Sequence, residues 1–158
     1  MRVGQGYDAH RFGVSGSADS VRLGGIAVPC DREIIAHSDG DVIVHALCDA
    51  LLGAAGLGDI GQHFPDSDAK YKDADSTGLL VEVAGQLEQL SFRIVNTDLT
   101  LIAQVPRIAL YRDAMRAAIA DLLDIDQTAV NIKATTTEGM GFIGRKEGLA
   151  AVAVALIE

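Results

Sequence analysis

Two short stretches, Tyr7-Asp8-Ala9-His10 and His37-Ser38-Asp39-Gly40-Asp41-Val42-Ile43-Val44-His45, decide how the chain is organised. The first ends a predicted strand over residues 1–12, and the second begins a predicted helix. Side chains two residues apart on a strand point to the same face, with Cβ atoms roughly 6–7 Å apart, so Asp8 and His10 can reach one ion. Three of the four histidines lie in these stretches. We therefore predict a metal site that the strand and the helix share.

The predicted helix runs to about Ala55 and is apolar on nearly every side, so we expect it to be buried. We expect Ser38 or Asp39 to cap it, with Asp41 in its first turn. Asp41, His45 and Asp49 are spaced by four and form one polar stripe. Polar side chains on a buried helix need partners. We therefore expect His45 to complete the ligand set, with Asp49 or Asp41 orienting its imidazole.

Two histidines and one aspartate leave coordination positions open, which is typical of a catalytic rather than a structural metal site. Zn²⁺ is the first choice for these ligands, and Fe(II), Mn²⁺ or Co²⁺ also suit them. An Asp-x-His pair also occurs by chance, and His45 can be an ordinary core histidine. The residues alone leave both interpretations open.

Composition indicates one α/β domain over residues 1–158, with 49% hydrophobic and 4% aromatic residues. No apolar run is long enough to span a bilayer, and the N-terminus lacks the apolar region of a signal peptide. The net charge of −9 argues against a general nucleic-acid or anionic-membrane surface. Cys30 and Cys48 lack metal-ligand spacing and are interpreted as thiols of a reducing cytosol. The bacterial cytoplasm is the favoured location, and a plastid after transit-peptide removal is the alternative.

The remaining elements follow from apolar patterns and breaks. We predict short strands over residues 21–28, a helix from Asp75 or Ser76 to about Leu90, and strands over 92–103, 130–136 and 149–157. Another helix over about 108–123 is expected to bury Leu110, Ala114, Ala117, Ala118 and Leu122. The segments 53–61 and 64–68 read as loops. The last strand has no polar face and must be covered on both sides. Helices can cover one side and a second subunit the other, so we expect an oligomer.

Two further segments are suited to phosphate. His37 and Ser38 precede a helix N-terminus, where free N–H groups bind anions, although simple capping explains them equally well. Thr135-Thr136-Thr137-Glu138 leads into a glycine-rich segment, residues 139–148. Its hydroxyl and N–H groups suit a di- or triphosphate, Arg145 can add a bidentate contact, and Glu138 can bind a second divalent ion. A β-hairpin with threonines chosen for strand propensity is the alternative.

Seven ordered motifs resemble the 2-C-methyl-D-erythritol 2,4-cyclodiphosphate synthase family, and together they cover essentially the whole chain. They are Gly-x-Asp-x-His (6–10), His-Ser-Asp-Gly-Asp (37–41), Gly-Asp-Ile-Gly (58–61), Phe-Pro-Asp-x-Asp (64–68), Ala-Gln-x-Pro (103–106), Lys-Ala-Thr-Thr-Thr-Glu (133–138) and Gly-Phe-x-Gly-Arg-x-Glu-Gly (141–148).

The resemblance implies a phosphorus–oxygen lyase of the non-mevalonate isoprenoid pathway. Its substrate would be 4-diphosphocytidyl-2-C-methyl-D-erythritol 2-phosphate. The 2-phosphate would attack the metal-bound β-phosphate, CMP would leave, and 2-C-methyl-D-erythritol 2,4-cyclodiphosphate would form. The implied fold has a mixed four-stranded sheet covered on one face by helices. In the implied homotrimer the sheets pack around a three-fold axis, with active sites at subunit interfaces.

The resemblance also assigns site residues. Asp8, His10 and His45 match Zn²⁺ ligands, and Glu138 matches the ligand of a second ion, Mg²⁺ or Mn²⁺. His37 and Thr136 match positions that stabilise the transition state. Substrate contacts are implied for Ser38, Asp59, Ile60, Gly61, Phe64, Pro65, Asp66, Ser67, Asp68, Ala103, Gln104, Val105, Pro106, Arg107, Ile108, Ala109, Thr135, Thr137, Phe142 and Arg145.

Two other functions fit some of the same residues. A metal-dependent phosphohydrolase would use two histidines, an aspartate and a phosphate loop to activate water. It would not need the His37/Ser38 and 64–68 loops, and its products would be open-chain phosphates. A non-catalytic trimeric nucleotide-binding protein would instead hold the metal for structural reasons only.

Overall fold

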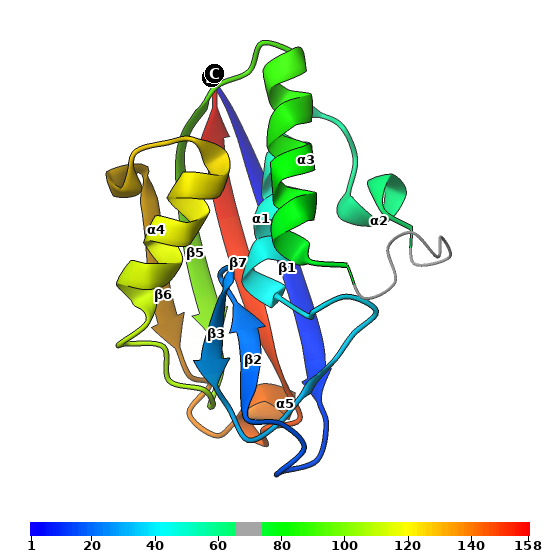
Figure 1. The fold of residues 1–158 in the computed structure, drawn as a ribbon, viewed down its shortest axis with the longest axis vertical. Helices are drawn as coiled ribbons and strands as arrows, with labels where there is room; N and C mark the ends of the chain where they lie inside the picture. Colours follow the sequence, from blue (N-terminus) through cyan, green and yellow to red (C-terminus); the bar gives the residue numbers. More distant parts are fainter. Residues whose placement is uncertain (66–73) are drawn as a thin grey trace.

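A mixed sheet is the centre of the molecule. A computed structural model describes residues 1–65 and 74–158 (Figure 1). In this sheet the neighbouring strands β5 (Ile94–Ile102) and β6 (Val130–Thr135) are parallel, and all other neighbours are antiparallel. The prediction of a mixed sheet is confirmed, but the predicted number of four strands is wrong, because a two-residue strand pairs with the end of β1. The five strands are, in order, β4 (Ile34–Ile35), β1 (Arg2–Phe12), β7 (Gly148–Ile157), β5 (Ile94–Ile102) and β6 (Val130–Thr135).

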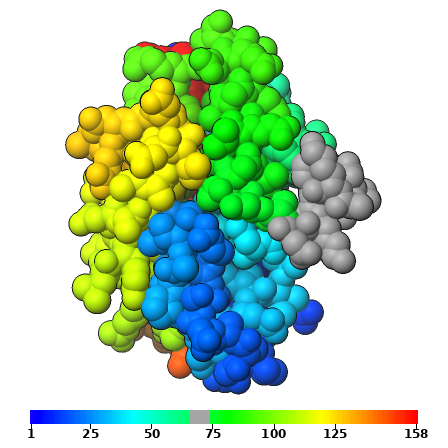
Figure 2. Space-filling model, viewed as in Figure 1, coloured from blue at the N-terminus to red at the C-terminus, as the bar shows by residue number. Residues whose placement is uncertain are grey.

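The three longer helices lie on one face of this sheet, as expected (Figure 1). They are α1 (Val42–Ala55), α3 (Ser76–Gln89) and α4 (Arg112–Leu123). α1 packs directly on β1 and β7, and α3 packs on α1. Figure 2 shows α3, α4 and the hairpin of β2 (Ser20–Leu23) and β3 (Ile26–Pro29) forming the outer surface of this side. No helix in the described ranges has the length and apolar character needed to cross a membrane.

Three short helical turns in the described ranges lie outside the predicted helices and strands. They are α2 (Ile60–His63), η2 (Gln127–Ala129) and α5 (Gly141–Gly144). α2 is capped by Asp59, whose side chain accepts from the backbone N–H of Gln62. A single four-residue turn carries too little periodicity to be recognised in a sequence.

Two glycines let β1 approach α1 closely. A Cβ atom on Gly4 would lie 1.9 Å from the carbonyl oxygen of Ala50, and one on Gly6 would lie 2.0 Å from that of Ala46. No residue with a side chain fits at this separation. Alternation along the strand then places Asp8 and His10 on the same face as these glycines, toward the helix.

Asp41 caps α1, whereas Ser38 or Asp39 was expected to do so. Its carboxylate is buried and accepts hydrogen bonds from the backbone N–H groups of Val44, Gly24 and Gly25 at 3.2, 2.8 and 2.7 Å. The last two donors belong to the β2–β3 turn. The same carboxylate therefore begins the helix and fixes the hairpin on it. Burial raises the pKa of Asp41, although the three N–H donors oppose that effect.

The predicted inner face of α4 is wrong for Leu110 and Ala114, whereas Ala117, Ala118 and Leu122 are half-buried and Leu122 packs against the core. Leu110 lies before the helix and is exposed, and Ala114 is exposed too. The buried stripe is instead formed by Met115, Ile119 and Leu123, at intervals of four residues. Met115 lies beneath the β2–β3 turn, where a Cβ on Gly24 would be 3.0 Å from its side chain.

The sheet face opposite the helices carries exposed apolar side chains. Val3 and Tyr7 of β1 are 68% and 52% exposed, and Val154 of β7 is 39% exposed. The register places Tyr7 beside Val152 and Gln5 beside Val154, so these residues form one surface, here called the outer sheet face. The inner side of β7 is covered by α1, whereas the part of the chain that the structure describes leaves this outer side open.

Candidate functional site

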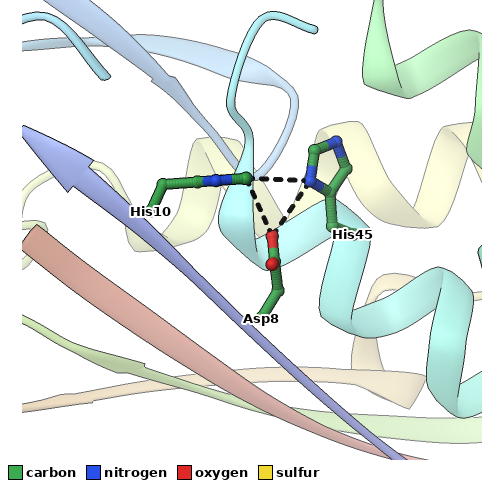
Figure 3. A group of neighbouring side chains, drawn as sticks. All are labelled: Asp8, His10 and His45. Atoms are coloured by element: carbon green, nitrogen blue, oxygen red, sulfur yellow. Dashed lines mark hydrogen bonds and ion pairs between the residues drawn. The ribbon is translucent and has the colours of Figure 1, made fainter. Parts of the chain in front are cut away.

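The candidate metal centre is a triangle of donor atoms from β1 and α1 (Figure 3). Asp8 Oδ2 lies 3.0 Å from His10 Nε2 and 3.0 Å from His45 Nδ1, and the two ring nitrogens are 3.1 Å apart. The three side chains point toward one another, and all are mostly buried. Within residues 1–65 and 74–158, this is the group whose donors lie close enough to share an ion.

The donor set fits a divalent cation. In a tetrahedral zinc site with bonds of about 2.0–2.1 Å, neighbouring donor atoms are about 3.3 Å apart, close to the separations here. Nitrogen and carboxylate donors suit Zn²⁺ and related ions. The prediction that these three residues lie together is confirmed.

Electrostatics favour an ionised carboxylate between the two rings. Burial opposes ionisation of Asp8, but hydrogen bonds from His10 and His45, together with their charges, hold its pKa well below the usual range. Burial also opposes protonation of His45, but the hydrogen bond and charge of Asp8, with the charges of Asp41 and Asp39, raise its pKa. A proton on His45 and a cation bound at the triangle would therefore compete with each other.

The second nitrogen of His45 has partners that the sequence did not indicate. Nε2 lies 2.8 Å from Ser76 Oγ at the start of α3 and 3.2 Å from Ser38 Oγ. The predicted orienting residues, Asp41 and Asp49, do not fill this role. Asp41 binds backbone N–H groups, and Asp49 accepts from the N–H of Ile60 at 2.8 Å. Asp49 instead anchors the beginning of α2.

A cavity of about 380 Å³ opens beside the triangle. It is lined by the three ligand candidates and by predicted contacts from two loops, His37 and Ser38 on one side and Ile60, Gly61 and Phe64 on the other. Asp59 and Pro65 adjoin this wall. The predicted contacts Asp66, Ser67 and Asp68 lie outside the described residues.

Ile35, Ala36 and Leu79 also line the cavity and were missed, because apolar wall residues have no chemical signature. We call the triangle and this cavity the metal half-site.

A second cavity, of about 400 Å³, lies at the ends of β5 and β6. Glu138 stands here in the left-handed backbone region, with φ of 52°, and accepts a hydrogen bond from Thr136 Oγ1 at 2.8 Å. Gln104 Nε2 is buried without a protein partner among the described residues. Because the resemblance implies a nucleotide pocket here, we call this cavity the nucleotide half-site. Of the predicted residues it gathers Ala103, Gln104, Pro106, Arg107, Ile108, Ala109, Thr135, Thr136 and Glu138, and it adds Arg112, which was missed.

Besides Asp59 and Pro65, four predicted contacts among the described residues line neither cavity. Val105 lies within the segment that builds the nucleotide half-site, joined to Pro106 by a cis peptide bond. Thr137 Oγ1 donates to the carbonyl of Met140 at 2.6 Å and so holds the turn before α5. Phe142 is exposed on α5. Arg145 makes two hydrogen bonds to Glu147, at 2.7 and 3.3 Å, and this pairing raises its pKa.

The two half-sites lie at the same end of the sheet but toward opposite edges of it. The register aligns Ala9 of β1 with Ala150 of β7, Ala150 with Ile102 of β5, and Ile102 with Thr135 of β6. Three strand spacings of about 4.8 Å separate β1 from β6 by about 14 Å. Two strands of the same chain therefore lie between the metal triangle and the threonines.

Comparison with known proteins identifies the family. The model of the YgbB family matches the whole chain, residues 1–158. The chain belongs to the YgbB family. This result confirms the resemblance found in the sequence motifs.

Proteins that resemble the chain match it over nearly its whole length. The 2-C-methyl-D-erythritol 2,4-cyclodiphosphate synthase of Nitrosococcus oceani is 55% identical over 157 residues, which cover 99% of this chain and 98% of that protein. The structure of IspF from Plasmodium falciparum in complex with CDP superposes with a TM-score of 0.86 at 34% identity, covering 99% of this chain and 94% of that one. Bifunctional IspDF from Campylobacter jejuni gives a TM-score of 0.93 at 43% identity, with 99% of this chain and 42% of that chain covered.

Proposed function

We propose that the chain converts 4-diphosphocytidyl-2-C-methyl-D-erythritol 2-phosphate to 2-C-methyl-D-erythritol 2,4-cyclodiphosphate and CMP. It is thus a cyclising phosphorus–oxygen lyase of isoprenoid biosynthesis. The observation that carries the proposal is the triangle of Asp8, His10 and His45, in a chain that matches this family of synthases from end to end. The CDP complex of the Plasmodium relative supports a cytidyl diphosphate substrate.

The reaction forms one bond and breaks one. An oxygen of the substrate's 2-phosphate attacks the β-phosphorus, and the bond from that phosphorus to the oxygen bridging it to the α-phosphate breaks. CMP leaves with this bridging oxygen, and an eight-membered ring closes. The nucleophile belongs to the substrate, so no serine, cysteine or water is needed. The protein must fold the substrate back on itself and hold its two phosphates together.

Each half-site has a separate task in this proposal. Asp8, His10 and His45 would hold Zn²⁺, and Glu138 would hold Mg²⁺ or Mn²⁺. The cations, when bound, neutralise phosphate charge that otherwise repels the attacking group and that builds on the departing CMP. His37 and Thr136 donate hydrogen bonds to the oxygens that gain charge in the transition state.

Binding is assigned to residues that line the two cavities and to further residues that the resemblance implies. Ser38, Asp59 to Gly61 and Phe64 to Asp68 would hold the erythritol and ribose. Ala103 to Ala109 would form the cytosine pocket, and Thr135 and Thr137 would contact the phosphates. Phe142 and Arg145 are assigned as further contacts. Arg145 would have to exchange Glu147 for substrate phosphate, since both are exposed and paired in the free chain.

We further propose that residues 1–158 act as one domain within a homotrimer. The separation of about 14 Å between β1 and β6 favours a site completed by a neighbouring chain. The exposed Val3, Tyr7 and Val154 give the outer sheet face an apolar surface for such contacts. The cytoplasm is proposed as the location, because Cys30 and Cys48 are both free thiols.

The reaction product tests the function. Purified protein with zinc and magnesium, given the proposed substrate, should yield the cyclic diphosphate and CMP by phosphorus NMR. Open-chain phosphates with CMP would instead indicate the phosphohydrolase. His45→Ala should abolish turnover while the circular dichroism spectrum stays native. Full activity of folded His45→Ala protein would contradict the role of the metal triangle.

Glu138→Gln should raise the magnesium or manganese concentration needed for half-maximal rate and leave bound zinc unchanged, because it removes charge from the nucleotide half-site alone. Glu82→Gln, on the exposed surface of α3, is the matched control. Equal metal requirements in the two variants would exclude Glu138 as a ligand.

A further inference from the structure

The far side of the His45 ring carries a hydrogen-bond chain that leads away from the metal triangle. Nε2 lies 2.8 Å from Ser76 Oγ, and the Ser76 hydroxyl donates in turn to Asp39 Oδ1. The backbone N–H of Ser76 also donates to Asp39 Oδ2, at 3.2 Å. Ser76 is completely buried, and the three residues come from α1, α3 and the loop before α1. Such a buried polar chain needs every hydrogen to have an acceptor.

The direction of each hydrogen bond follows from Asp39. An ionised carboxylate only accepts, so the Ser76 hydroxyl hydrogen points to Asp39. The lone pairs of Ser76 Oγ are then left to accept from His45 Nε2–H. When Nε2 of a neutral imidazole carries the hydrogen, Nδ1 presents a lone pair. Nδ1 is the atom that lies 3.0 Å from Asp8 and 3.1 Å from His10 in the triangle.

We infer that Ser76, held by Asp39, is a positioning residue that fixes the His45 tautomer whose Nδ1 can bind the cation. The inference rests on the metal centre of the proposed function. Ser76 touches neither the triangle's donor atoms nor the cavity beside them in the described structure. Its effect on the reaction is therefore expected to pass through His45 alone.

Ser38 offers an internal comparison. Its Oγ lies 3.2 Å from the same nitrogen, but it accepts from the N–H of Gly40, also at 3.2 Å. Within the described ranges no carboxylate takes the hydroxyl hydrogen of Ser38, so that hydrogen is free to turn toward His45 as well as away from it. Ser38 therefore does not impose one tautomer, although it is the same residue type beside the same atom.

Zinc affinity is the first test, measured on folded protein by competition with a chromophoric chelator. Ser76→Ala should weaken zinc binding by about 10- to 100-fold, the range found when a residue that orients a histidine ligand is removed. Ser38→Ala should weaken it less than Ser76→Ala does. A Ser76→Ala affinity equal to that of the wild type, or an equal loss in both variants, would overturn the inference. If the wild type itself binds no zinc, the proposed metal centre fails as well, which separates the two failures.

The tautomer is the second test, and it does not depend on activity. Histidine-labelled wild type, loaded with zinc, should show in proton–nitrogen correlation spectra a hydrogen on His45 Nε2 and metal at Nδ1. A hydrogen on Nδ1 would refute the assignment even if Ser76→Ala does not fold. Folded Asp39→Asn protein should show a lower zinc affinity, a change in the same direction as that of Ser76→Ala. Unchanged zinc affinity in folded Asp39→Asn protein would show that Asp39 has no part in positioning His45.

Discussion

At the scale of single residues, Asp8 and His45 form an ion pair whose stabilising effect depends on pH. The pKa of Asp8 is lowered and that of His45 is raised in the metal-free chain. The Asp8 contribution is present above its unfolded pKa of about 3.9 and is lost as pH falls toward the lower folded value. The His45 contribution is present below its unfolded pKa of about 6.5 and is lost as pH rises through the higher folded value.

We therefore predict opposite pH trends with and without metal. In EDTA, the melting temperature of the wild type relative to Asp8→Asn should be highest between about pH 4 and 6.5 and should decline above that range. With excess zinc, the stabilisation over the EDTA sample should grow as pH rises, because the metal replaces the His45 proton. Parallel trends in the two samples would show that proton and zinc do not compete for this centre.

The three residues of the triangle could be predicted from sequence, whereas the residue that contacts the far side of His45 could not. Spacing by two on a strand and burial on a helix were enough to bring Asp8, His10 and His45 together. Ser76 is 31 positions from His45, and its role depends on how α3 packs on α1. Local patterns do not contain that contact. Asp41 and Asp49 were expected to orient His45, but both carboxylates accept hydrogen bonds from backbone N–H groups instead.

At the scale of secondary-structure elements, the contact of β1 with α1 sets the geometry of the metal half-site. Asp8 and His10 belong to the strand and His45 to the helix, so their separation follows the distance between the two elements. That distance depends on Gly4 and Gly6, which leave no space for a Cβ. Backbone packing and metal geometry are therefore determined by the same contact.

Gly6→Ala should reduce both stability and zinc affinity. Its Cβ would lie 2.0 Å from the Ala46 carbonyl oxygen, so the strand and helix must separate, at a cost of about 3 kcal/mol or more. Gly85→Ala on α3 is the control, because no described atom lies within 4 Å of the added Cβ and alanine favours the helix by up to about 1 kcal/mol. Urea unfolding and chelator competition measure the two effects. If Gly6→Ala protein keeps the wild-type zinc affinity, the geometry of the metal half-site does not depend on this strand–helix contact.

The elements were predicted well where their patterns are long. The boundaries of α3, β5 and β7 agree with expectation within about two residues. β4 was not predicted, because two residues are too few to show the alternation of apolar and polar side chains that indicates a strand. The face of α4 was misassigned because alanines populate most of its sides, and only its contact beneath the β2–β3 turn selects Met115.

At the scale of the whole molecule, the outer sheet face is the surface on which assembly is expected. Val154→Lys should convert the proposed trimer to smaller species and reduce turnover, because a lysine would be buried at the subunit contact. Val81→Lys is the matched control, since Val81 is 48% exposed on α3, against 39% for Val154. Light scattering would measure the masses. A stable, fully active Val154→Lys monomer would refute the shared active site.

The order of the strands also determines how defects combine in a mixture of chains. Asp8→Asn damages the metal half-site and Glu138→Gln the nucleotide half-site, three strands away in the same chain. In a ring of subunits refolded from equal amounts of both variants, about one junction in four would join two intact halves. At a magnesium concentration too low to support Glu138→Gln alone, about a quarter of wild-type activity would then return from two almost inactive parents. In genetic terms, alleles that damage different half-sites would complement one another within this one gene, whereas alleles that damage the same half-site would not.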